Sequence, residues 1–195
     1  MEERELKNNY VFTLVKFFLF LIIFCFLAKF IHYFIKEIHS VAGLDFNTFI
    51  GAIVAVFAFY LFLTDLNGFY KKIQRFFFRS KFFSCLFPSI LIILALSYFF
   101  IPKIFNISFD KNLFVFLGSS SLFIHLIYVA RATKGNSFNT LVNYLFIFSI
   151  LIVLNLIFFG LYLKINFNFE LGKVLLDGVQ AGTALIRDVF VKGFK

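Results

Sequence analysis

The sequence predicts an all-α, polytopic membrane protein with five transmembrane helices and a C-terminal amphipathic helix. Three observations predict it: hydrophobic residues make up 62% of the 195-residue chain, 36 residues are Phe, and the mean hydropathy is +0.95. Five apolar stretches are long enough to cross a hydrocarbon core about 30 Å thick as helices. Because lipid offers no partners to backbone N–H and C=O groups, each stretch must satisfy them internally, as a helix does.

Short polar or charged connections separate the predicted spans, so residues 1–164 are expected to form one helical bundle. The spans are residues 10–35, 46–63, 82–102, 113–130 and 141–163. The first span is expected to remain uncleaved, because acidic residues precede it and its apolar run is longer than that of a signal peptide. Lys16 and Lys29 bracket the centre of this span, so their amines are placed to reach opposite headgroup regions.

The second and third spans each carry a feature that predicts packing or a boundary. In the second, Gly51, Ala55 and Ala58 recur at steps of four and three residues. A stripe of small residues lets another helix approach closely, so we interpret it as a packing surface. The third span has Pro88 in its first turns, where a missing N–H costs least, and is expected to end at Pro102.

The fourth span has the most informative face within the predicted membrane region. Its small and polar residues share one side of the helix: Gly118, Ser121, His125 and Tyr128. Such a face is expected to look at protein or water rather than lipid, and an ionisable residue inside a span is a functional candidate. Two interpretations of His125 stay open. It braces a neighbouring helix, for instance through Asn143 or Asn155 of the fifth span, or it lines a path for a solute.

The connection between the second and third spans is strongly basic. Its cations are Lys71, Lys72, Arg75, Arg79 and Lys81. The following connection carries only Lys103 and Lys111, so the positive-inside rule predicts that the basic connection and the N-terminus are cytoplasmic. Aromatic residues alternate with these cations, which is typical of an interfacial segment whose rings sink into the bilayer while its cations contact anionic lipid. We expect no nucleic-acid partner, because aromatic rings beside a membrane contact lipid and are not available to stack on bases.

Residues 165–195 are expected to form an amphipathic tail that lies on the membrane interface or docks on a partner helix. Charged residues interrupt it too often for a span, yet one broad face is apolar. Gly178 and Gly182 form a small-residue step within that face, and Leu175 and Leu185 flank it. We interpret these four residues as a docking surface for a protein partner.

The chain carries no recognisable catalytic, metal-binding or cofactor-binding signature. None of its ten carboxylates lies inside a predicted span, which argues against a carboxylate-driven carrier. No Gly-rich phosphate loop, HExxH pair or Ser nucleophile elbow occurs. The sequence therefore favours a non-catalytic membrane subunit that packs into a larger assembly, with other membrane subunits or a second copy as partners. The alternative is a small channel or transporter component whose fourth span lines the path.

One segment carries a family resemblance. Residues 125–138, with Asn143 and Tyr144 after them, resemble the Yip-type family of five-span trafficking proteins. That family places two further spans after this segment, whereas here those spans are absent and the amphipathic tail takes their place. Because of this departure, the chain is not assigned to the family.

Overall fold

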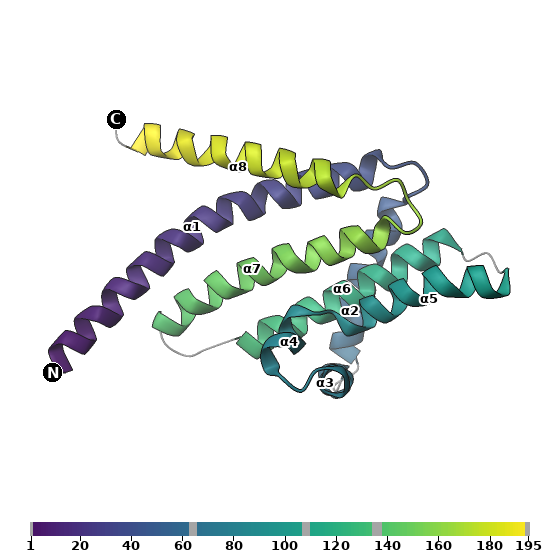
Figure 1. Ribbon diagram of the computed structural model, residues 1–195, viewed down its shortest axis with the longest axis horizontal. Coiled ribbons are helices and arrows are strands. Elements are labelled where there is room, and N and C mark those ends of the chain that lie inside the picture. The colour runs from purple at the N-terminus through teal and green to yellow at the C-terminus, as the bar shows by residue number, and fades with distance from the viewer. Residues whose placement is uncertain (1, 63–65, 107–109, 134–137, 194–195) are drawn as a thin grey trace.

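The protein is entirely helical in the parts that the computed structural model describes, which are residues 2–62, 66–106, 110–133 and 138–193 (Figure 1). These parts hold eight helices and no strand, so the predicted all-α class is confirmed. The helices are α1 (Glu2–Ser40), α2 (Phe46–Phe62), α3 (Leu66–Phe77), α4 (Lys81–Leu86), α5 (Ser89–Phe105), α6 (Lys111–Thr133), α7 (Phe138–Leu163) and α8 (Leu171–Gly193).

Three helices are long and apolar enough to cross a membrane: Val11–Ser40 of α1, all of α6, and Leu141–Leu163 of α7. These correspond to the first, fourth and fifth predicted spans. The helices α2 and α5 have 17 residues each, which corresponds to about 26 Å of rise and is shorter than a typical span. Membrane insertion is thus supported by three candidate spans, and the prediction of five is not confirmed.

The third predicted span is not a single helix, because the chain breaks between α4 and α5. Phe87 has an extended conformation (φ −106°, ψ 118°), since a following proline disfavours helical geometry at the preceding residue. Pro88 lacks an N–H and so cannot continue the hydrogen bonding of α4. The predicted end was also wrong: α5 continues through Pro102 and terminates at Asn106, which adopts a left-handed conformation (φ 52°).

Aspartates precede two of the helices and fix where they begin. The Asp45 carboxylate accepts hydrogen bonds from the N–H groups of Asn47 (3.0 Å) and Thr48 (3.1 Å) and from the Thr48 hydroxyl (2.7 Å). These bonds, led by that of the hydroxyl, lower the pKa of the Asp45 carboxyl. Asp110 accepts a bond from the Asn112 N–H (2.9 Å) at the start of α6. Both carboxylates satisfy N–H groups that the first helical turn leaves unpaired.

The core lies where α2 and α7 pack on α6 and α1 packs on α7. Phe114 of α6 stacks on Tyr162 of α7 with ring centroids 3.9 Å apart, and the Tyr162 hydroxyl donates to the Phe114 carbonyl (2.7 Å). A Cβ at Gly118 would overlap the Tyr162 ring, so a glycine is required for this close approach. On α1, the buried Phe30 and Phe34 continue the same core.

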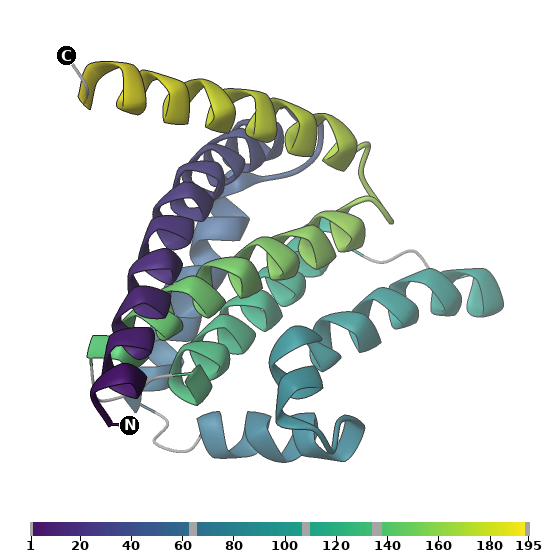
Figure 2. The ribbon, with the colours of Figure 1, turned by 60° about the vertical axis from the view of Figure 1, so that its left-hand side comes forward.

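The C-terminal helix α8 runs back beside α1 and contacts it at two glycines (Figures 1 and 2). A Cβ at Gly178 would lie 3.2 Å from the Phe30 Cα, and one at Gly182 would overlap the Phe26 ring. The small-residue step of the tail therefore packs within the chain, as such steps do between helices in membranes. The buried face of α8 meets α1 at these glycines, whereas Leu175 and Leu185 are only partly buried, so the docking of a protein partner on the tail stays a prediction.

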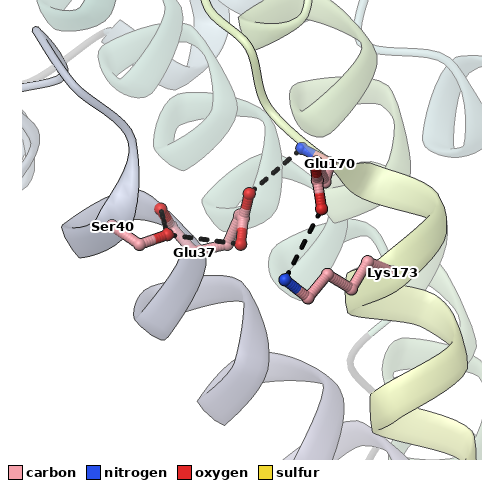
Figure 3. Close-up of polar contacts among 4 residues, drawn as sticks. All are labelled: Glu37, Ser40, Glu170 and Lys173. Carbon is pink, nitrogen blue, oxygen red and sulfur yellow. Dashed lines mark hydrogen bonds and ion pairs between the residues drawn. The ribbon is translucent and has the colours of Figure 1, made fainter.

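The start of α8 is tied to the end of α1 by a small polar group (Figure 3). Glu37 of α1 accepts a hydrogen bond from the N–H of Glu170, the residue that precedes α8 (3.2 Å). It also accepts bonds from the Ser40 hydroxyl, at its side chain (3.3 Å) and its carbonyl (3.0 Å). Lys173 pairs with the Glu170 carboxylate at 3.6 Å, an exposed pair that contributes little. The carboxylate of Glu37 thereby occupies the positive end of the α8 dipole.

Candidate functional site

The stripe on α6 that the sequence singled out lies in the interior of the protein. Gly118, Ser121, His125 and Tyr128 are all buried, and His125 has no exposed surface. The stripe is covered by Tyr162 at Gly118 and by α3 and α4 along its C-terminal half. It faces protein from Gly118 to His125, whereas Tyr128 at its C-terminal end also lines a cavity.

Around His125 the structure brings together side chains from three helices, which we call the histidine cluster: Tyr70 and Gln74 of α3, Cys85 of α4 and His125 of α6. The Tyr70 hydroxyl lies 2.8 Å from His125 Nδ1, and Gln74 Nε2 lies 3.1 Å from the same nitrogen. Gln74 Nε2 also donates to the Tyr70 hydroxyl (2.7 Å), and His125 Nε2 lies 3.1 Å from the Cys85 carbonyl oxygen. The cluster therefore joins the predicted interfacial connection to the fourth predicted span.

The partners of the imidazole define its tautomer. A carbonyl oxygen only accepts, so Nε2 must carry the hydrogen that it donates to Cys85. With this hydrogen on Nε2, Nδ1 of a neutral imidazole carries one lone pair, which accepts from the Tyr70 hydroxyl or from Gln74 Nε2. The neutral form with its hydrogen on Nε2 fits these partners, because a second proton on Nδ1 would remove that lone pair. The arrangement is that of a structural brace.

The expected partners in α7 bond elsewhere. Asn143 Oδ1 accepts a hydrogen bond from Lys16 Nζ (2.8 Å), so this amine contacts α7. Asn155 Nδ2 donates to the Leu151 carbonyl of its own helix (2.8 Å). The interpretation of His125 as a brace to α7 is thus corrected: its bonds run to α3 and α4, because the bend at Phe87 brings α4 over α6.

Next to the histidine cluster lies a cavity of about 430 Å³, which we call the basic pocket. Its lining residues are Asn67, Lys71, Arg75, Phe78, Arg79, Lys81, Ser84, Tyr128, Arg131 and Ala132. Five of these residues are cationic, and none of the ten is acidic. The buried hydroxyls of Ser84 and Tyr128 also line it and are bonded to each other (2.7 Å). The pocket thus combines a positive rim with neutral hydrogen-bonding groups.

The three faces of α3 explain how one short helix serves both features. Tyr70 and Gln74 are four residues apart and point into the histidine cluster. Lys71 and Arg75 follow them by one residue and line the pocket. Because successive residues are about 100° apart on a helix, a third face remains, and it carries the exposed Phe76. The segment that the sequence described as an interfacial connection is therefore a helix with a core face, a pocket face and an apolar outer face.

The structure divides the predicted interfacial cations into two sets. Lys71, Arg75, Arg79 and Lys81 line the pocket, whereas Lys72 is exposed and does not. Arg131 completes the pocket from α6, a role that the sequence pattern did not predict. The sequence feature that points to this role of Arg131 is its position three residues after Tyr128, at the end of the polar stripe. That position becomes informative only once α3 and α4 are known to cover this end of α6.

The remaining polar groups give no indication of a metal centre. Among the residues that the structure describes, no three His, Cys, Asp or Glu side chains gather in a way that could hold a metal ion. Cys25 and Cys85 are both free thiols, and Cys85 is buried beside the histidine cluster. The chemistry that the site offers is therefore hydrogen bonding and positive charge.

Comparison with family models, with curated proteins and with solved structures finds no match to this chain. The resemblance of residues 125–138 to the Yip-type family accordingly gains no support from a family model. In the structure this segment begins at His125, whose bonds to α3 and α4 account for its burial.

Proposed function

We propose that this chain is a non-catalytic, multi-pass membrane subunit that packs into a larger assembly through the outer face of α2. The observation that carries the proposal is the position of Gly51. It is exposed in the interior of an apolar helix, and a Cβ placed on it would have nothing within 4 Å. Within the chain α2 packs through Phe49, Ala52 and Val56 instead.

The expected packing stripe on the second predicted span is thus turned away from the body of the protein. Ala55 and Ala58 are only partly buried, because the large side chain of Phe49 anchors α2 on the core by a neighbouring face. The stripe is left facing outward, where lipid or another chain covers it. A glycine in a helix costs about 1 kcal/mol relative to alanine, and contact with lipid returns none of it.

Four other glycines in the described helices make close contacts, whereas Gly172, in the first turn of α8, resembles Gly51 because an added Cβ would have nothing within 4 Å. Gly118 accommodates Tyr162, Gly160 accommodates Leu171, and Gly182 accommodates Phe26. A second helix seated on α2 would give Gly51 the same role, since small residues are what membrane helices use to approach one another. This pattern supports an intermolecular contact at the outer face of α2.

The alternative of a channel or transporter component receives less support from the geometry. It required the α6 stripe to line a path, yet Ser121 and His125 are buried and the His125 ring bonds through both nitrogens. A solute on this route would have to displace Tyr162 from Gly118 and open the histidine cluster. We therefore retain the subunit proposal.

Co-purification from mild detergent, with two differently tagged copies in the same cells, tests the proposal. Gly51→Leu fills the outer stripe without a clash inside the chain, so the fold should persist while the partner, whether another subunit or the second copy, is lost. Ala28→Leu is the matched control, because it adds similar bulk at an exposed position of α1. Equal recovery of partners with Gly51→Leu and the parent chain would contradict the proposal.

A further inference from the structure

We propose that the basic pocket binds the phosphate-bearing headgroup of an anionic lipid. The inference is independent of the subunit proposal, because it concerns the cavity between α3, α4 and α6 and not the outer face of α2. The sequence predicted only that this segment contacts lipid at the interface. The proposal names the cavity, the phosphate that it binds and the residues that bind it, and Lys72 is not among them.

The charge of the pocket points to an anion. Lys71, Arg75, Arg79, Lys81 and Arg131 line one cavity from three segments of the chain, and none of the described residues that line it is acidic. Like charges held together raise one another's energy, and an anion among them relieves that repulsion. Guanidinium groups are suited to phosphate in particular, because their planar fork donates two parallel hydrogen bonds to its oxygens.

Neutral groups in the pocket complement the charge. Ser84 and Tyr128 share one hydrogen bond between their hydroxyls, which leaves the hydrogen of the other hydroxyl available to a ligand. Asn67 contributes a buried amide oxygen that has no hydrogen-bond partner; this oxygen can accept a hydrogen bond from a hydroxyl of the headgroup but not from a phosphate oxygen. A cavity of about 430 Å³ falls within the range of sites that hold small ligands, so it accommodates a phosphate with the group esterified to it.

Aromatic residues around the pocket indicate that the ligand comes from the membrane. Phe69 and Phe76 on the outer face of α3 are 61% and 84% exposed, and Phe82 of α4 is 67% exposed. Rings of this size do not remain in water beside so many cations without an apolar medium to enter. If they enter the hydrocarbon edge, the mouth of the pocket lies at the level of the phosphates. The phosphate nearest to the pocket is then that of a lipid headgroup.

The absence of Trp from this chain allows a direct binding experiment. Phe78 lines the pocket, so Phe78→Trp places a single reporter there. The full-length variant is reconstituted in phosphatidylcholine nanodiscs that contain a rising fraction of phosphatidylglycerol, and Trp fluorescence is recorded. We expect a saturable change that pure phosphatidylcholine does not produce. Inorganic phosphate and glycerol 3-phosphate, added to phosphatidylcholine nanodiscs, form the second arm and should produce no comparable change.

Two charge-removing variants on the same helix make the test specific to the pocket. Arg75→Gln removes a pocket cation and should weaken the apparent affinity for phosphatidylglycerol about tenfold or more, since a charge-assisted hydrogen bond is lost. Lys72→Gln removes an equal charge three residues earlier, outside the pocket, and should leave the affinity within about twofold. Equal weakening by both variants would show an unspecific charged surface and overturn the proposal.

The remaining outcomes are also decisive. No saturable response to phosphatidylglycerol, or saturation by soluble phosphate alone, overturns the lipid assignment. If Phe78→Trp does not fold, retention of phosphatidylglycerol over phosphatidylcholine by the otherwise unaltered chain is measured by native mass spectrometry. In that experiment too, Arg75→Gln should lose the retained lipid while Lys72→Gln keeps it, and the reverse order would refute the assignment.

Discussion

Replacing His125 by alanine is expected to open the junction between α4 and α6. The change removes the bonds of both imidazole nitrogens. Tyr70 and Gln74 keep their mutual bond, but the Tyr70 hydroxyl hydrogen loses its acceptor and the buried carbonyl of Cys85 loses its donor. An unpaired buried carbonyl costs about 1–3 kcal/mol, and the space left by the ring adds to it. We therefore expect a destabilisation of about 2–4 kcal/mol.

Cys85 supplies the measurement, because its own carbonyl is one of the groups that lose a partner. Its side chain is 6% exposed, so a maleimide reaches it only when the junction opens. With Cys25 replaced by serine, the labelling rate reports the opening equilibrium. A cost of about 2–4 kcal/mol corresponds to an increase of roughly 30- to 700-fold in that rate when reclosing is fast.

Conservative variants identify the bond that matters. Glutamine places an amide nitrogen near the position of Nε2, so His125→Gln should restore most of the protection of Cys85. Asparagine reaches only the position of Nδ1, so His125→Asn should restore less. His32→Ala is the control, since His32 is exposed on α1. A labelling rate within about threefold of the parent for His125→Ala would refute the assignment of the imidazole as a brace.

Two further predictions concern the tail and the topology. Gly182→Leu should separate α8 from α1, because its side chain would overlap Phe26, and limited proteolysis should then cut the tail faster. Thr183→Leu, one residue later and exposed, should leave the cutting rate unchanged. For the topology, Ser80→Cys in a chain without Cys25 and Cys85 should resist labelling from outside intact cells and react after permeabilisation. Ser80 is exposed, so efficient labelling from outside would reverse the orientation.

The helical class and most helix limits could be predicted from the sequence, because they depend on local signals. Predicted spans 46–63 and 113–130 correspond to Phe46–Phe62 and Lys111–Thr133. An apolar run sets the body of each helix, and Asp45 and Asp110 before them supply side-chain oxygens for the first turn. The break at Phe87 is also encoded locally, by Pro88, although the apolar run that surrounds it is long enough for one span.

The partners of the predicted site residues were out of reach for a different reason. Tyr70 and His125 are 55 residues apart, and His125 and Cys85 are 40 apart, so no periodicity along one helix connects them. The polar stripe on α6 predicts that protein covers it. The helix that covers its C-terminal half is α3, in a segment that the sequence predicts to be a connection on the membrane surface. On α2, periodicity located the small residues and left undetermined which face meets the core, because Phe49 and Val56 offer an alternative apolar face.

The histidine cluster and the basic pocket depend on each other through the rotation of α3 about its axis. Tyr70 and Lys71 are neighbours in sequence and lie about 100° apart on the helix. If α3 turned by one residue, Lys71 would replace Tyr70 beside His125, and a cation would enter a site that offers it no acidic partner. Burying an unpaired charge costs far more than any bond in the cluster contributes. The bonds from Tyr70 and Gln74 to His125 thereby hold Lys71 and Arg75 toward the pocket, which makes His125 a positioning residue for a site that it does not touch.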